Sequence, residues 1–432
     1  MNITDIAKNA NTSALVLAHL STNLKNQALV LMADALEENC DAILSANEKD
    51  LEFAKKEGIA QPLIARLALN EEKVSGMAKG IRSVVALEDP VGKVKSTMEM
   101  DQGLVVKQVT CPIGVIGAIF ESRPDAVSQI SSLCLKSGNA VILKGGTEAQ
   151  NSNKVIVNLL VEAISKVPGL PISAVQMIET RSEVADMLKE DKYIHLVVPR
   201  GSNAFVKYIQ ENTRIPVLGH SEGVCHGYID KLADLDKSIR ICLDSKLQYP
   251  AACNAMETLL VHKDIAEKVL PDLVGIFKEK QVELVGCVKT CQVVPEVPLA
   301  HESDWDMEYN DLQLSIKIVD SFSEAVKFIN RHGSGHTDVI ITENLERAEQ
   351  FLNEVSSSSV MWNASTRFAD GFRYGLGAEI GISTNRTHAR GPVGLEGLII
   401  YKYKLYGNGQ VAGDYSGANA REFTHKPLTP SM

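Results

Sequence analysis

Several features that would define a function class are missing from this chain of 432 residues. No run of about 18 apolar residues is present, so no segment is predicted to span a membrane. Residues 1–10 are polar and lack the basic start and apolar run of a secretory signal. The formal net charge is −10, and an acidic protein has no electrostatic reason to bind nucleic acid or an anionic membrane. We therefore expect a cytoplasmic protein without such partners.

Cysteine is sparse, and its eight positions follow no pattern of known function. There is no CxxC pair and no series of cysteines and histidines at metal-ligand spacing, so we predict neither a disulfide framework nor a metal site. The GxGxxG fingerprint of dinucleotide binding is also missing early in the chain. Gly375, Gly377 and Gly381 imitate it, but they lie too late and no strand–helix–strand unit follows, so we interpret them as loop glycines.

What is present is the pattern of an α/β protein. Residues 1–85 carry apolar positions at helical spacing. Beyond them, short apolar runs alternate with helical segments, which is typical of parallel sheets with crossover helices. The chain length and the two series of runs predict two lobes with a ligand cleft between them. The expected strands are 114–120, 140–143, 174–178, 195–198 and 227–229, and then 257–261, 314–319, 338–342 and 360–363.

Two further stretches predict a small projecting ribbon. Residues 103–112 (GLVVKQVTCP) and 398–406 (LIIYKYKLY) both alternate β-branched or apolar residues with others and end at a breaker. An exposed pair of strands invites aggregation unless another subunit covers it. We therefore expect a homo-oligomer.

Two cationic residues follow predicted strands in a way that is typical of ligand sites. Lys144 ends a strand and is followed by Gly145 and Gly146, which would let the backbone approach a ligand at the carboxyl end of the sheet. Arg200 follows the next such strand, and its guanidinium matches the geometry of a cofactor phosphate. Ordinary strand-to-helix turns with solvated side chains would give the same pattern.

Cys253 lies in the run YPAACNA, where a proline ends the preceding helix and small residues surround the thiol. A cysteine on such a tight loop is accessible to a substrate, whereas Cys134 and Cys242 lie in apolar helical patterns. The local pattern alone leaves an inert thiol as the alternative.

Seven segments, in order and spread over essentially the whole chain, resemble the aldehyde dehydrogenase superfamily. They are FESRP (120–124), GNAVILKGG (138–146), VPRGS (198–202), LGHSEGVCHGYI (218–229), PAACN (250–254), RHGSGHTDV (331–339) and ARGPVGLEG (389–397). Within the superfamily they are most similar to the branch that reduces L-glutamyl 5-phosphate with NADPH in proline biosynthesis. Phe328 departs from the histidine that is common in that branch.

The resemblance implies a role for individual residues. Cys253 matches the cysteine that accepts the acyl group, and Ser122 takes the place of an asparagine that supplies an oxyanion donor. Lys144, with Gly146 beside it, matches the lysine on the adenine-side ribose or its 2′-phosphate. Ser202 matches a residue near the cofactor pyrophosphate, and Glu308 a glutamate on the nicotinamide ribose.

The resemblance also implies an order of domains. We expect a cofactor-binding domain in residues 1–94 and 111–222, a catalytic domain in 223–390, and an oligomerisation flap in 95–110 and 391–432. The fold class is then two α/β lobes with parallel sheets plus a β-ribbon. Association with the kinase that makes the acyl phosphate, glutamate 5-kinase, is compatible with this function, although no residue indicates it.

An anionic substrate needs cationic or N–H donors, and Arg123, Ser365 and Arg367 are the candidates for binding its phosphate and α-carboxylate. Each arginine could instead belong to a surface or interlobe salt bridge.

The direction of the reaction follows from a missing base. Aldehyde-oxidising relatives carry a glutamate upstream of the cysteine that activates water, but at that spacing this chain has Gly219 or His220, and Glu222 is slightly displaced. This favours reduction of the thioester over its hydrolysis. A hydrolytic aldehyde dehydrogenase and a non-catalytic binding protein on the same fold remain as alternatives.

Overall fold

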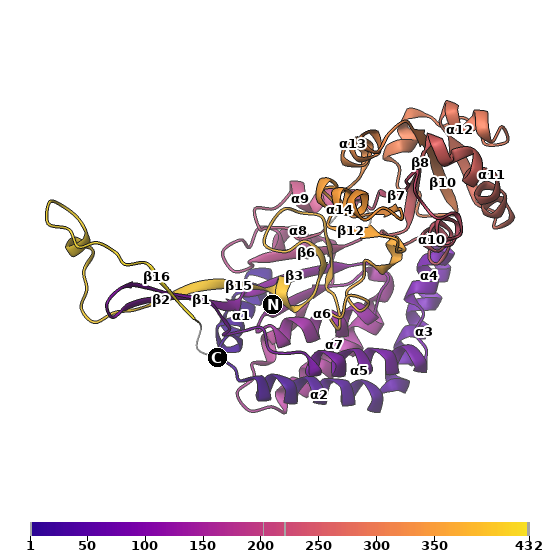
Figure 1. Ribbon diagram of the computed structural model, residues 1–432. Coiled ribbons are helices and arrows are strands. Elements are labelled where there is room, and N and C mark those ends of the chain that lie inside the picture. The colour runs from indigo at the N-terminus through magenta and orange to yellow at the C-terminus, as the bar shows by residue number, and fades with distance from the viewer. Residues whose placement is uncertain (1, 202, 220–221, 430–432) are drawn as a thin grey trace.

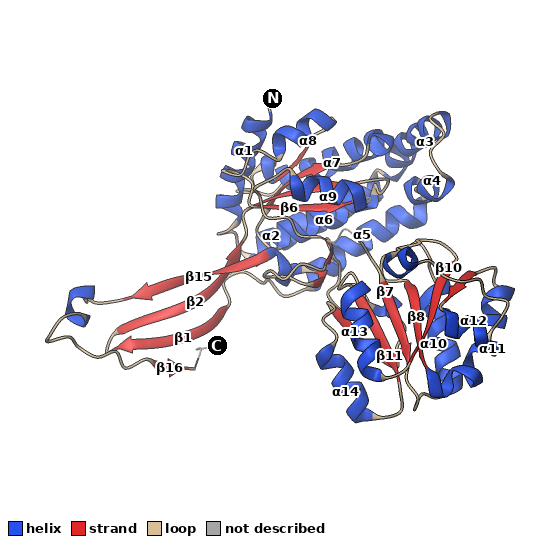
Figure 2. Cartoon of the chain, turned by 90° about the horizontal axis from the view of Figure 1, so that it is seen from above, coloured by secondary structure: helices blue, strands red, loops and turns tan. Residues whose placement is uncertain are grey.

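A computed structural model describes residues 2–201, 203–219 and 222–429. Two α/β units with parallel sheets lie next to each other, and a long antiparallel ribbon projects from the first (Figures 1 and 2). This is the expected fold class. Within the described residues, no helix combines the length and the hydrophobicity that crossing a bilayer requires.

The first unit is built around a parallel sheet with the strand order β5-β4-β3-β6. Every residue of β3 (Val115–Phe120) and β4 (Ala140–Lys144) is buried, which is why both strands are continuous apolar runs rather than alternating ones. The outer strands are β5 (Val175–Met177) and β6 (Leu196–Arg200). Helices α1, α6 and α7 pack on this sheet, and α2 and α5 pack on α6 and α7 as an outer layer. The apolar faces of all five helices belong to one continuous core with the sheet.

The helices of the first unit include the N-terminal series that the sequence predicts. They are α1 (Ile3–Leu17), α2 (Thr22–Glu38), α3 (Cys40–Lys56), α4 (Gln61–Leu67), α5 (Glu71–Ala86), α6 (Asp125–Lys136), α7 (Gln150–Ser165), α8 (Arg181–Met187) and α9 (Asn203–Glu211).

The second unit contains a six-stranded parallel sheet with the order β12-β11-β7-β8-β10-β9. Helices cover both faces of the sheet (Figure 2). Because neighbouring residues of a strand point to opposite faces, Tyr228 belongs to one core cluster and Ile229 to the other. The strands are β7 (Cys225–Ile229), β8 (Met256–His262), β9 (Glu283–Gly286), β10 (Gln313–Val319), β11 (Thr337–Ile341) and β12 (Ser359–Trp362), and the helices are α10 (Leu235–Leu247), α11 (Lys263–Glu279), α12 (Val288–Val293), α13 (Phe322–His332) and α14 (Leu345–Glu354).

The projecting ribbon is an antiparallel sheet with the order β15-β2-β1-β16. The sequence predicts β2 (Leu104–Pro112) and the edge strand β15 (Ile399–Tyr406), but not β1 (Val94–Asp101) or the short β16 (Lys426–Leu428). Residues 400–406 of β15 are all exposed, including three tyrosines. That another subunit covers this strand stays a prediction.

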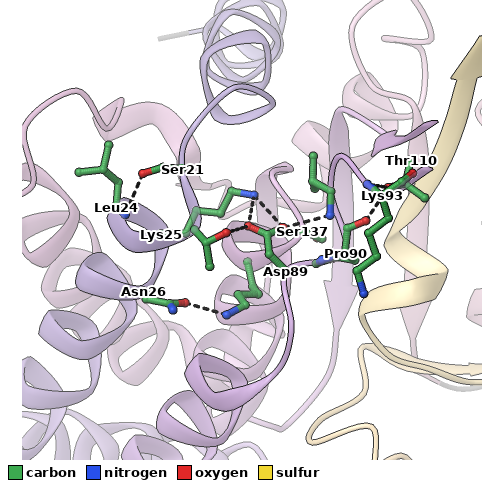
Figure 3. A network of polar contacts seen from close by, with 12 residues as sticks. Ser21, Leu24, Lys25, Asn26, Asp89, Pro90, Lys93, Thr110 and Ser137 are labelled. Carbon is green, nitrogen blue, oxygen red and sulfur yellow. Dashed lines mark hydrogen bonds and ion pairs between the residues drawn. The ribbon is translucent and has the colours of Figure 1, made fainter. Parts of the chain in front are cut away.

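A buried polar network holds the base of the ribbon against the N-terminal helices (Figure 3). The ammonium of Lys25, which is 1% exposed, lies 2.9 Å from a carboxylate oxygen of Asp89. The hydroxyl of Thr110 donates to the carbonyl of Pro90 (2.7 Å) and accepts from the backbone N–H of Lys93 (2.8 Å). These contacts therefore hold the base of the ribbon in one position relative to the first unit.

The late glycines lie in two different settings. Gly375 and Gly377 lie in a loop with φ of 78° and 75°, as predicted for loop glycines. Gly381 instead begins β13 (Gly381–Ser383), which pairs with β14 (Gly391–Val393). The two strands bring residues of this segment to the cleft beside Cys253.

Candidate active site

Cys253 lines one of three neighbouring cavities. We call them the thiol cavity (about 610 Å³, containing Cys253), the Lys144 cavity (about 730 Å³) and the α5 cavity (about 700 Å³, along one face of α5). Leu63 and Glu121 line both the thiol and the Lys144 cavities. The thiol and α5 cavities share Arg66, Arg123, Arg200, Tyr249, Asp370 and Glu379. The thiol thus lies between two spaces that can hold different ligands.

Cys253 is presented by the short loop between α10 and β8. Two tight turns shape the loop, because Ala252 N donates to the Tyr249 carbonyl (3.2 Å) and Ala255 N to that of Ala252 (2.8 Å). The Asn254 amide donates to the Ala369 carbonyl (2.9 Å) and ties the loop to the segment after β12. Cys253 is half-buried and reaches the cavity.

Cys134 and Cys242, which the sequence places in apolar helices, have a different environment from Cys253. Cys134 and Cys242 are fully buried in helices, and burial raises the pKa of the Cys134 thiol far above its ordinary value and that of Cys242 to about 12. Both therefore stay protonated at neutral pH, and neither lines one of the three cavities.

Glu308 also lines the thiol cavity. Gly223 packs against both Glu308 and the loop that carries Cys253. A Cβ at position 223 would lie 2.2 Å from the Cys253 carbonyl oxygen and 2.7 Å from the Glu308 carboxylate. Glycine is therefore the residue that allows these two groups to approach each other.

A buried ion pair supports the loop that carries Glu308. The ammonium of Lys246 donates to one oxygen of Glu257 (2.5 Å), and the other oxygen accepts from the backbone N–H of Asn310 (3.2 Å). Both side chains of the pair are fully buried. Burial raises the pKa of Glu257 to about 7, the charge of Glu308 acts in the same direction, and Lys246 opposes it. Burial also lowers the pKa of Lys246.

Three guanidinium groups line the boundary between the thiol and α5 cavities. Arg66 donates to the hydroxyl of Tyr249 and to the Ala251 carbonyl (3.3 Å each), and Arg200 donates to the Gln129 side chain (3.2 Å). Arg123 is half-buried, and burial together with the charge of Arg200 lowers its pKa. Arg200 was expected to bind a cofactor phosphate, but it does not line the Lys144 cavity.

The other predicted substrate residues lie after β12. Arg367 lines the thiol cavity and donates to the Gln248 side chain (2.8 Å); burial, together with the charge of Arg373, lowers its pKa. Ser365 is buried and does not line the cavity. Its hydroxyl accepts from Arg367 N (3.3 Å), so it shapes the turn that carries the arginine.

The Lys144 cavity contains Lys144, Gly146 and Ser122. The N–H and hydroxyl of Ser122 both donate to one oxygen of Glu148 (2.6 and 2.8 Å). Ser122 does not line the thiol cavity, so the structure does not bring the expected oxyanion donor to Cys253. Ser202, expected near the pyrophosphate, lies outside the described residues.

Of the two glycines after Lys144, Gly145 is required by packing, whereas at Gly146 only the flexible end of the Glu148 side chain is in the way. A Cβ at Gly145 would lie 1.9 Å from the Asn153 amide, and one at Gly146 would lie 1.9 Å from the Glu148 carboxylate. The turn can therefore fold closely beside the lysine, whose pKa burial lowers.

Arg66, Arg181 and Glu379 are among the charged residues of these cavities that the sequence did not predict. Arg66 comes from α4, far from any motif, and Arg181 from the first turn of α8, where it lines the Lys144 cavity. Glu379 lines the thiol and α5 cavities, accepts from Gly371 N (2.8 Å) and has a pKa raised by burial. No local pattern marks Arg66 or Arg181, because their proximity to the site arises only from tertiary packing.

Comparison with known proteins gives consistent matches. The model of the aldehyde dehydrogenase family matches residues 1–295. Gamma-glutamyl phosphate reductase of Acetivibrio thermocellus is 53% identical, covering 99% of both chains, and that of Methanococcoides burtonii is 55% identical, covering 98% of this chain and 96% of the relative.

Solved structures give the same result. The crystal structure of gamma-glutamyl phosphate reductase from Thermotoga maritima has a TM-score of 0.92 at 42% identity, covering 95% of this chain and 100% of that one. An engineered glycolyl-CoA reductase with bound NADP⁺ shares the fold at 14% identity, with a TM-score of 0.65 and coverage of 94% and 96%.

Proposed function

Because this chain belongs to the aldehyde dehydrogenase family and, within it, to the gamma-glutamyl phosphate reductases, we propose that it reduces L-glutamyl 5-phosphate to L-glutamate 5-semialdehyde and phosphate through a thioester on Cys253. It is an oxidoreductase of amino-acid biosynthesis. The observation that carries the proposed mechanism is the position of Cys253 between the Lys144 cavity and the arginine-lined α5 cavity.

The thiolate of Cys253 attacks the carbonyl carbon of the acyl phosphate. A carbon–sulfur bond forms, the carbon–oxygen bond to the phosphate breaks, and the electron pair leaves on the phosphate oxygen. A thiolate suits this step because it is both a good nucleophile and a good leaving group. Arg367 lines the same cavity, and its positive charge attracts the thiolate of Cys253.

The Lys144 cavity fits a nicotinamide dinucleotide, because it combines cationic groups with apolar walls. Lys144 and Arg181 would hold the adenine-side ribose and its 2′-phosphate, which favours NADPH, and Phe53 and Ile59 offer an apolar surface to the base. The bound cofactor supplies the hydride that reduces the thioester and frees the thiolate. Glu308, in the thiol cavity, would hold the nicotinamide ribose.

The cavity favours reduction over hydrolysis. Glu222, the carboxylate closest to the position of the water-activating base, is exposed and does not line the thiol cavity. A thioester without such a base persists until hydride reaches it. We further propose that residues 1–94 and 111–222 bind the cofactor, that 223–390 carry the thiol, and that 95–110 and 391–432 mediate homo-oligomerisation.

The test is the reverse reaction, oxidation of glutamate 5-semialdehyde with NADP⁺ in the presence and absence of phosphate. Strict dependence on phosphate is expected, and Cys253→Ala should abolish the activity while the melting temperature stays unchanged. Cys291→Ala is the matched control, because Cys291 is also half-buried but lines none of the three cavities. Activity without phosphate would identify a hydrolytic aldehyde dehydrogenase instead, and full activity of Cys253→Ala would exclude the thioester.

A further inference from the structure

We propose that Arg66, Arg123 and Arg200 bind the phosphoryl group of the substrate, and that the α5 cavity behind them is the path by which inorganic phosphate leaves. The proposal rests on the function proposed above. The steps proposed at Cys253 do not involve the α5 cavity, and inorganic phosphate is the ligand that we assign to it.

The first argument is the convergence of the three arginines. All three line both the thiol cavity and the α5 cavity, although they come from α4, the turn after β3 and the end of β6. Among the described residues, the guanidinium of Arg123 has no ion pair and no hydrogen bond. Burial and the charges of Arg200 and Arg66 lower its pKa, while Asp125 opposes them, so like charges face one another in this cluster. A bound anion would relieve this repulsion.

The second argument is the balance of charge. The α5 cavity is lined by five lysines and arginines and three aspartates and glutamates, whereas the thiol cavity has four of each sign. The Lys144 cavity has two cationic and three acidic residues. Among the described residues, only the lining of the α5 cavity has more cationic than acidic side chains. Its formal charge of +2 matches the charge of a phosphate dianion.

The other charged end of the substrate fits this excess less well. An α-ammonium and an α-carboxylate together carry no net charge, whereas a phosphate group carries about two negative charges near neutral pH. Guanidinium groups also match phosphate oxygens in a bidentate geometry. The charge and the chemistry of the cluster both favour phosphate.

The third argument is the open face of α5. Gly76 and Gly80 lie one turn apart on the helix and line the cavity, and a Cβ at either position would meet nothing within 4 Å. The wall therefore leaves space for a small ion. After the carbon–oxygen bond breaks, the phosphate keeps the electron pair, takes a proton from water and leaves along this wall, away from the Lys144 cavity.

The test changes residues of the α5 cavity and leaves Cys253 unchanged. Gly80→Leu places a side chain in open space, and Arg123→Met removes a guanidinium of the cluster. In the reverse reaction, both variants should raise the KM for phosphate about tenfold or more, as expected for loss of charged hydrogen bonds or of the space for the ion, while the KM values for semialdehyde and NADP⁺ stay within about twofold. Gly275→Leu is the matched control, because Gly275 is a helical glycine of α11 with nothing within 4 Å of its Cβ position.

A binding measurement separates this proposal from the proposed reaction. Calorimetric titration of inorganic phosphate into the Cys253→Ala protein should show binding that Gly80→Leu and Arg123→Met weaken by about the same factor. A rise in KM for semialdehyde instead of phosphate would place the amino-acid end of the substrate in this cavity and overturn the proposal. Unchanged phosphate binding in both variants would also overturn it. If the wild type binds phosphate but does not form semialdehyde, the proposed function fails while the phosphate site stands.

Discussion

The thiol of Cys225 donates a hydrogen bond of 3.2 Å to the main-chain carbonyl oxygen of Cys253. Cys225 is the first residue of β7 and is fully buried. Burial raises the pKa of its thiol well above the ordinary value, so the group keeps its proton and remains a donor. Cys225, in the sheet, therefore supports the loop that carries Cys253.

Replacing Cys225 tests this support. Cys225→Ala removes the donor and should lower kcat about fivefold, since one hydrogen bond contributes about 1 kcal/mol, with little change in the KM values. Cys225→Ser keeps a donor and should retain most of the activity. Steady-state kinetics of both variants, with melting temperatures as the control, make the comparison. Equal losses in the two variants would show that the hydrogen bond is not the reason.

The raised pKa of Glu257 predicts a pH dependence of stability. Its ordinary value is 4.5 and its value in the folded chain is about 7, so between these values the folded state holds a proton that the unfolded state has lost. The free energy of unfolding should therefore decrease as the pH rises through this window, by up to about 1.4 kcal/mol per pH unit. Urea unfolding at pH 5 and pH 7.5 measures it.

Glu257→Gln is the control for this slope. Glutamine resembles the protonated carboxyl that the folded state holds below about pH 7, so the variant should lose the difference between the two pH values that Glu257 contributes. An unchanged slope in Glu257→Gln would assign the pH dependence to other groups.

Lys144 and Arg181 test the proposed NADPH site. Lys144→Ala and Arg181→Ala should each raise the KM for NADPH about tenfold and that for NADH much less, because each removes a cation proposed to bind the 2′-phosphate. Arg200→Ala should leave the KM for NADPH unchanged, since Arg200 lines other cavities. If Arg200→Ala raised only the KM for NADPH, Arg200 would bind a cofactor phosphate, as its sequence pattern predicts.

The ion pair at the base of the ribbon should be costly to break. Asp89→Asn leaves the buried ammonium of Lys25 without its counter-charge and should lower the free energy of unfolding by about 3 kcal/mol. Lys237→Ala is the matched control, because the side chains of the Lys237–Glu343 pair are 52% and 47% exposed and such pairs contribute under about 1 kcal/mol. Similar losses in the two variants would contradict the argument.

The sequence predicted strands whose residues are buried on both faces, because such strands are uninterrupted apolar runs. β3 and β4 belong to this class, and the prediction of both is close to the observed bounds. It missed β9 and β1, which lie at a sheet edge or in the ribbon and include polar residues. Pairing with a neighbouring strand decides the conformation of such segments, and one sequence does not show that neighbour.

The site was predictable only where the local sequence marks its residues. Lys144 was predicted from its place at the end of a strand, and Cys253 from its tight loop of small residues and from the family resemblance; both line cavities. For Arg200 the pattern gave the right end of the sheet, but contact with Gln129 of α6 directs the guanidinium to another cavity than the one expected. In the same way, the hydroxyl of Ser122 donates to Glu148. The orientation of both side chains thus depends on partners that the local sequence does not reveal.

The glycine at position 223 has a consequence for engineering this enzyme. A library that randomises the cleft to accept other acyl phosphates can vary many wall positions, but every codon except that of glycine at 223 would place a side chain against the Cys253 carbonyl and Glu308. Such variants would push Cys253 and Glu308 apart before any new substrate is tested. The most productive design keeps this position fixed and diversifies the α5 wall, where Gly76 and Gly80 leave empty space.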